Sequence, residues 1–128
     1  MIAVNRQGEV WVFAEQERGV LSEVPLELLG KGRELADTLG VPLGAVLLAA
    51  GDGEGMATRL GQYGADKVYL VEDELLRHYQ TATYAHTVCE LVQANAPQIV
   101  LYGATAMGRD LAPTVASALK CGLTADCT

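Results

Sequence analysis

Apolar runs and helical repeats alternate along most of this chain. Short, nearly continuous apolar segments are each followed by a stretch whose apolar residues recur three or four positions apart. The pattern predicts strands at 9–15, 43–50, 67–71 and 98–102, helices at 25–39, 56–63, 81–95 and 109–119, and a possible last strand at 123–127. Because strands that alternate with helices are joined by right-handed crossovers, the fold class is α/β, a parallel sheet with helices on both faces.

Glycines mark the connections between these elements. Gln16–Gly19 is predicted to be a turn, and Gly51–Gly55 a flexible loop. The glycines at 51, 53 and 55 do not complete the dinucleotide-binding pattern G-x-G-x-x-G, because Met56 stands where a glycine is needed and the loop follows the second strand rather than the first.

Composition narrows the class of protein. The 128 residues are enough for one domain with its own core, and half of them are apolar. A formal net charge of −7 argues against nucleic-acid binding. The three cysteines form no C-x-x-C pair, and no signal peptide or membrane-length apolar run is present, so we expect a cytoplasmic protein with reduced thiols.

The most informative segment for function is the turn after the fourth strand. Gly103, Ala104 and Thr105 follow an apolar run, and Arg109 and Asp110 are predicted to open the next helix, with Asp110 as its cap. A helix start at the carboxyl end of a strand attracts anions. Arg109 and Asp110 stand where a P-loop would have a lysine followed by a serine or threonine, which argues against ATP hydrolysis. Two interpretations remain open: Arg109 holds an anionic group, or it pairs with Asp110 or a neighbouring carboxylate and orients the turn.

No catalytic constellation is evident elsewhere. His78 and His86 have neither metal-ligand spacing from a cysteine nor a serine or cysteine in a triad motif. We therefore expect no metal site and no catalytic residue.

Several separated segments of the chain resemble the amino-terminal domain of the electron-transfer flavoprotein alpha subunit. They are VWVFAE at 10–15, LELLGKGRELADTLG at 26–40, YGADKVY at 63–69, YQTATYA at 79–85, GATAMGRDLAP at 103–113 and GLTADCT at 122–128. The last two are the most specific. The chain departs from the family pattern at Thr114, where arginine is typical, and at Cys121, where threonine is common.

The resemblance implies a fold and a role. The fold is a three-layer α/β/α sandwich, Rossmann-like and similar to adenine-nucleotide α-hydrolases, with strand order 3-2-1-4-5. The role is that of an electron carrier subunit and not an enzyme. The resemblance implies that the alpha subunit forms a heterodimer with a beta subunit. In this heterodimer FAD carries electrons from acyl-CoA or similar dehydrogenases, as in fatty acid beta-oxidation, to a membrane quinone reductase or another acceptor. The style of the sequence is closer to prokaryotic members.

The resemblance also implies where the cofactors lie. FAD is held mainly by a carboxyl-terminal domain, which residues 1–128 do not include, and AMP or a second FAD belongs to the beta subunit. We therefore expect the coding sequence to continue past Thr128, and this domain to bind no cofactor by itself. Gly103, Ala104, Thr105 and Arg109 are the expected cofactor-proximal or subunit-interface residues. The alternative is a free-standing adenine-nucleotide-binding module of the universal stress protein type.

Overall fold

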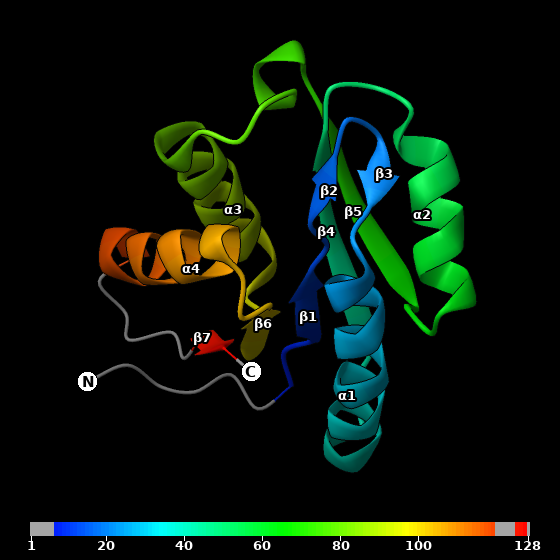
Figure 1. The fold of residues 1–128 in the computed structure, drawn as a ribbon. Coiled ribbons are helices and arrows are strands. Elements are labelled where there is room, and N and C mark those ends of the chain that lie inside the picture. The colour runs from blue at the N-terminus through cyan, green and yellow to red at the C-terminus, as the bar shows by residue number, and fades with distance from the viewer. Residues whose placement is uncertain (1–6, 120–124, 128) are drawn as a thin grey trace.

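A computed structural model describes residues 7–119 and 125–127, and Figure 1 shows their arrangement. In chain order the elements are β1 (Val10–Phe13), β2 (Gln16–Glu17), β3 (Val20–Leu21), α1 (Glu23–Leu39), β4 (Leu43–Ala49), α2 (Gly53–Gln62), β5 (Lys67–Glu72), the 3-10 turn η1 (Glu74–Leu76), α3 (Thr81–Asn95), β6 (Ile99–Tyr102), α4 (Ala106–Leu119) and β7 (Ala125–Cys127). The alternation predicted from the apolar pattern is confirmed.

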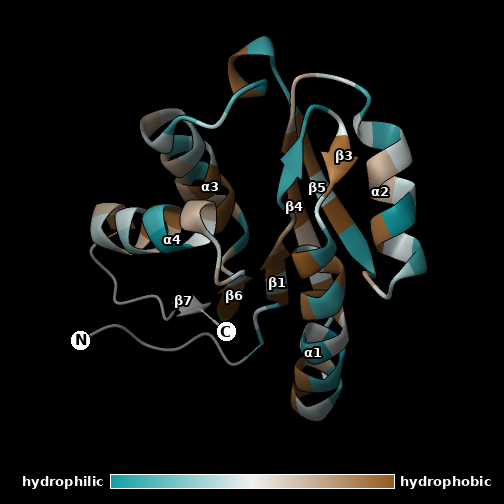
Figure 2. Ribbon diagram, in the orientation of Figure 1, coloured by the Kyte–Doolittle hydropathy of each residue, from teal (hydrophilic) through white to brown (hydrophobic). Residues whose placement is uncertain are grey.

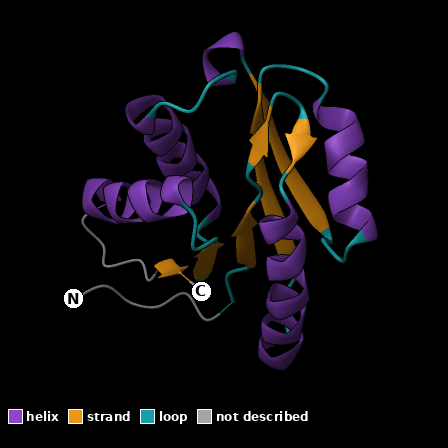
Figure 3. Ribbon diagram, in the orientation of Figure 1, coloured by secondary structure: helices purple, strands orange, loops and turns teal. Residues whose placement is uncertain are grey.

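The main sheet is parallel and has the order β5-β4-β1-β6-β7. Counted along the chain among these five strands, this is the order 3-2-1-4-5 that the resemblance implied. Helices α1 and α2 cover one face of the sheet, and α3 and α4 lie on the other (Figure 3). The expected three-layer α/β/α sandwich is therefore confirmed.

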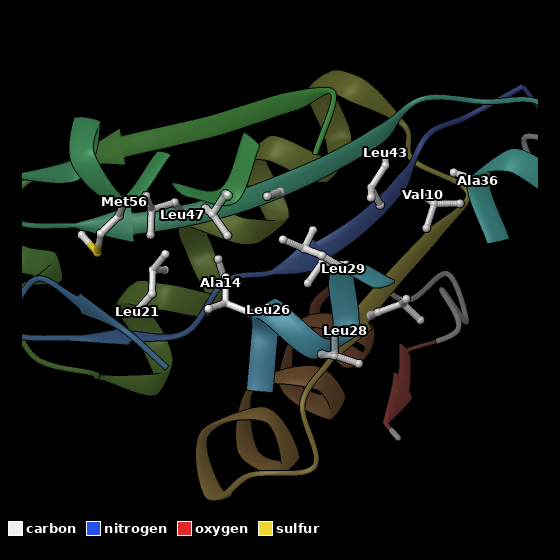
Figure 4. Close-up of a cluster of buried hydrophobic side chains, with 14 of the residues drawn as sticks. Val10, Ala14, Leu21, Leu26, Leu28, Leu29, Ala36, Leu43, Leu47 and Met56 are labelled. Atoms are coloured by element: carbon white, nitrogen blue, oxygen red, sulfur yellow. The ribbon is translucent and has the colours of Figure 1, made fainter. Parts of the chain in front are cut away.

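Two apolar cores lie on the two faces of the sheet, because successive strand residues point to opposite sides. In β1, Val10 and Val12 pack toward α1 and α2, whereas Trp11 and Phe13 pack toward α3 and α4. Figure 4 shows the first core, in which the side chain of Leu29 from α1 is completely buried. Helix α1 approaches the sheet closely at Gly32, where an added Cβ would lie 2.8 Å from a Leu43 methyl group.

Three segments differ from the prediction by more than two residues. The predicted turn at 16–19 is part of an antiparallel hairpin, β2–β3, whose tip residues Arg18 and Gly19 both have positive φ (54° and 80°), as a tight two-residue hairpin turn requires. Helix α2 begins at Gly53, inside the predicted loop 51–55. Helix α4 begins at Ala106, three residues before Arg109, so that Pro113 lies inside the helix.

The last strand predicted at 123–127 is present over its described part as β7, whereas Cys121 lies outside the described residues. None of the helices in the described part of the chain combines the length and the apolar character needed to cross a membrane.

Candidate functional site

The strand order places a topological switch point between β1 and β6. From β1 the chain crosses through α1 to β4 on one side, and β6 lies on the other side of β1, paired with it in parallel. Ligands of open α/β sheets bind in the crevice at the carboxyl ends of such strands. Glu15 follows β1 and Gly103 follows β6 at this position.

We call residues 103–108 the glycine corner. The Thr105 hydroxyl oxygen accepts a hydrogen bond from the Gly108 amide (3.0 Å), and the Arg109 amide donates to the Thr105 carbonyl (2.9 Å). Thr105 is therefore the cap of α4, since its side chain satisfies an amide of the first helical turn. The first turn packs directly on the corner, because a Cβ added at Gly108 would overlap the Gly103 carbonyl oxygen.

A carboxylate closes this corner from the β1 side. Glu15 is only 7% exposed, and it accepts a hydrogen bond from the Thr105 hydroxyl. At Gly103 an added Cβ would lie 2.7 Å from Val24 and 3.4 Å from a Glu15 carboxylate oxygen. A negative charge thus already lies beside the amino-terminal turn of α4, so a second anion at the corner would meet a like charge.

The four residues that the sequence singled out fall into two groups by their burial. Gly103 is buried and Thr105 is half-buried, and both build the corner. Ala104 and Arg109 are exposed. Arg109 takes part in no ion pair with any residue that the structure describes. The described residues therefore give no support to the expected ion pair between Arg109 and Asp110.

Asp110 is not the cap of α4, because it lies one turn inside the helix. Its carboxylate accepts hydrogen bonds from the Tyr79 phenol (2.6 Å) and the Thr81 hydroxyl, which connect the start of α3 to α4. The bonds from Thr81 and Tyr79 lower the pKa of Asp110. Burial and the bond to Asp110 raise the pKa of Tyr79 to about 12. Thr81 is the first residue of α3, and the cap position is Gln80.

A second feature was missed by the sequence analysis. A hollow of about 450 Å³, the carboxyl-edge cleft, lies between the β2–β3 hairpin, the loop after β4 and the segment after η1. It is lined by Gln16, Arg18, Gly19, Ala50, Gly51, Asp52, Arg77 and His78. These segments are far apart in the sequence, and only the order of the sheet brings them together. The available signal was that two of them directly follow predicted strands.

An adjoining hollow of about 470 Å³ is acidic, with Asp52, Glu54 and Glu72 among its lining residues. Glu72 accepts a hydrogen bond from the Gly53 amide (3.1 Å) and so fixes the start of α2. Within 7–119 and 125–127, no group of three or more histidine, cysteine or acidic residues is arranged to hold a metal ion.

Comparison with known proteins identifies relatives over nearly the whole chain. The family model described as "Electron transfer flavoprotein domain" matches residues 10–128. The electron transfer flavoprotein subunit alpha of Clostridium acetobutylicum is 54% identical over 119 residues, which cover 93% of this chain and 35% of that protein. The acryloyl-CoA reductase electron transfer subunit beta of Anaerotignum propionicum is 44% identical over 125 residues, covering 98% and 34%. This chain thus spans about a third of the length of these curated relatives.

Among solved structures, the universal stress protein from Archaeoglobus fulgidus in complex with dAMP superposes with a TM-score of 0.59 over 94% of this chain and 96% of that one. At 14% sequence identity the likeness concerns the fold alone. It supports the expected Rossmann-like class, and it carries no information on the ligand of this chain.

Proposed function

This chain belongs to the electron transfer flavoprotein family, and from that membership we propose that it is the part of the alpha subunit that docks the beta subunit and frames the FAD. The observation that carries the proposal is the match of residues 10–128 to the family, together with 54% identity to an alpha subunit. In the complete complex the FAD supplies the redox chemistry, and the protein supplies binding and orientation. The electrons come from acyl-CoA or similar dehydrogenases and pass to a quinone reductase or another acceptor. The Anaerotignum relative, named as an electron transfer subunit of acryloyl-CoA reductase, supports the acyl-CoA side of this proposal.

The glycine corner does not fit the pyrophosphate of FAD. The buried Glu15 carboxylate lies against Gly103, and the first turn of α4 leaves no room for even a Cβ at Gly108. A pyrophosphate at a helix start needs open amides and no competing negative charge. We therefore place the FAD on a carboxyl-terminal domain of the complete subunit. The relatives are about three times as long as this chain, which leaves ample length for such a domain.

The exposed side of the corner fits a subunit contact better than a cofactor site. Arg109 projects from the first turns of α4 without an ion-pair partner in the described chain, and Ala104 beside it is also exposed. A guanidinium that forms no ion pair within the described chain, next to a small side chain, can approach a carboxylate of another protein closely and bind it with two parallel hydrogen bonds.

The test is co-expression of the complete alpha subunit with its beta subunit. We expect Arg109→Ala to reduce the amount of beta subunit that co-purifies and the flavin content of the complex. Lys31→Ala, an exposed cation on α1, is the matched control and should leave both unchanged. If the Arg109 variant assembles with normal flavin content and redox potential, Arg109 has no role at an interface.

The alternative function, a free-standing adenine-nucleotide module, is not favoured, because the family match and the identity to alpha subunits point elsewhere. Isothermal titration of this chain with AMP, ATP and FAD separates the two functions. Micromolar binding of AMP or ATP would favour the nucleotide module and contradict the proposal made here.

A further inference from the structure

Two short segments rise above the carboxyl edge of the sheet and carry the most exposed large apolar side chains of the described chain. They are the β2–β3 hairpin and η1, the green turn at the top of Figure 1. Val20 on the hairpin is 66% exposed and Leu75 in η1 is 72% exposed. In Figure 2 both segments contain residues coloured as hydrophobic. Their chain neighbours Leu21 and Leu76 belong to the two buried cores, whereas Val20 and Leu75 do not.

Two arginines lie in the cleft between these two segments. Arg18 of the hairpin and Arg77 after η1 line the carboxyl-edge cleft, and Asp52 is the only acidic residue among the described residues that line it. A lining with more basic than acidic residues is unusual for a chain with 9 basic and 16 acidic residues. Arg18 forms no ion pair with the described residues, and Arg77 pairs with the exposed Glu74, an interaction that another carboxylate can readily replace.

Both segments are held in place by the rest of the fold. The side-chain amide nitrogen of Gln16 donates to the Leu48 carbonyl (2.9 Å). The side-chain oxygen of Gln16 accepts from the backbone amide of Gly19 (3.0 Å), which fixes the hairpin tip. In η1, Leu76 is buried and its carbonyl accepts from the Tyr84 phenol (2.6 Å). A surface that is already ordered loses little conformational entropy when a partner binds.

We propose that this cleft, together with the exposed Val20 and Leu75 on the two segments beside it, docks a segment of the partner beta subunit that presents a carboxylate between apolar side chains. The inference rests on the proposed function and names a contact surface for it, at the tips of the sheet and separate from Arg109. Arginine beside exposed apolar side chains is typical of the centres of protein interfaces. A small anion would pair with the two arginines and leave Val20 and Leu75 uncovered, so these exposed apolar side chains favour a protein partner.

The first experiment is hydrogen–deuterium exchange on the complete alpha subunit, alone and in complex with its beta subunit. We expect backbone amides in residues 16–21 and 73–78 to exchange more slowly in the complex. Equal exchange with and without the beta subunit would overturn the inference. This measurement uses the unchanged protein, so it decides the question even if a variant fails to fold.

The second experiment reverses charge. Arg18→Glu with Arg77→Glu should weaken binding of the beta subunit by at least about tenfold. Lys31→Glu with Arg59→Glu, which makes the same change in net charge on the exposed faces of α1 and α2, should not. If the unaltered alpha subunit binds its beta subunit and the Arg18/Arg77 variant binds equally well, this inference is wrong while the proposed function stands.

Two further outcomes identify other occupants. If the unaltered alpha subunit does not bind the beta subunit at all, the proposed function fails and this inference fails with it. If instead pyrophosphate shifts the NMR signals of residues 18, 19, 77 and 78 and the beta subunit does not, the cleft is a small-anion site. Self-association of the alpha subunit that depends on Val20 and Leu75 would assign the surface to a second copy of the chain.

Discussion

Thr105 donates a hydrogen bond to Glu15 across 90 residues of sequence, and this bond joins the carboxyl ends of two neighbouring strands. The same hydroxyl oxygen accepts from the Gly108 amide and so caps α4 (3.0 Å). One side chain therefore couples the end of β1, the end of β6 and the start of the last helix. The switch point of this fold, where related architectures place ligands, is closed here by the protein's own carboxylate.

Thr105→Val should destabilise the domain by about 2–4 kcal/mol. The variant loses a helix cap worth about 1 kcal/mol and leaves the buried Glu15 carboxylate without its donor, at a further cost of about 1–3 kcal/mol. Urea unfolding of this domain measures the difference. Thr87→Val is the matched control, because the Thr87 hydroxyl donates only to a carbonyl of its own helix, and it should change stability by less than about 0.5 kcal/mol.

A double substitution tests whether the two side chains act together. When Glu15→Gln is combined with Thr105→Val, the total loss should be smaller than the sum of the two single losses, because the amide leaves no charge unpaired. Strictly additive losses would mean that the Thr105–Glu15 bond does not couple the two strands.

Gly108→Ala should destabilise the domain by at least about 2 kcal/mol, because the added Cβ would overlap the Gly103 carbonyl oxygen and force the first turn of α4 away from the corner. Gly30→Ala, at an open position inside α1, should instead stabilise it by about 0.5–1 kcal/mol through the better helix propensity of alanine. Thermal unfolding of the two variants gives opposite shifts in Tm. A shift in the same direction for both would show that the corner is not closely packed.

The main elements could be predicted because each continuous apolar run, and each helical repeat of apolar residues, is long enough to be recognised. Leu43–Ala49 is completely buried on both faces, and such a strand is recognisable as a continuous apolar segment. The β2–β3 hairpin could not be predicted, because strands of two residues carry no period and Arg18 is an uncommon residue at a position with positive φ.

The site could be predicted only in part, since its contacts join distant segments. The glycine turn at Gly103 is visible in the sequence, whereas the carboxylate that closes it comes from Glu15, which looks like an ordinary polar residue at the end of the first predicted strand. The start of α4 was placed one turn too late because Pro113 is typical of a first helical turn. The cleft depends on the order β5-β4-β1, which no local pattern contains.

Glu9→Gln should lower stability near neutral pH by about 1–3 kcal/mol, and the difference should vanish in acid. Burial by itself raises the pKa of Glu9, but hydrogen bonds from Lys67, Tyr69 and Trp11 outweigh it and the net pKa is lowered. A carboxylate with a lowered folded pKa stabilises the fold above its unfolded pKa, and this stability is lost as pH falls through the folded value. Unfolding measured from neutral to acidic pH checks both parts.

Glu27→Gln is the control for the loss of one carboxylate, since Glu27 is exposed on α1. It should change stability by less than about 0.5 kcal/mol at every pH. If Glu9→Gln behaves like this control, or if its effect persists below the folded pKa, the Glu9 cluster does not contribute through its charge.

Asp110→Asn distinguishes a side-chain link from a helix cap. Because Thr105 caps α4, the helix should form normally in this variant. The Tyr79 phenol, however, loses the carboxylate that contributes to raising its pKa to about 12, so Tyr79 should ionise at lower pH. The ultraviolet signal of phenolate followed against pH, with Tyr79→Phe to assign the transition, measures the change. Asp37→Asn, which removes an exposed carboxylate that pairs with Arg33, should leave the tyrosine titration unchanged. Faster amide exchange at the start of α4 in Asp110→Asn, with Tyr79 titrating as before, would instead identify Asp110 as the cap that the sequence predicted.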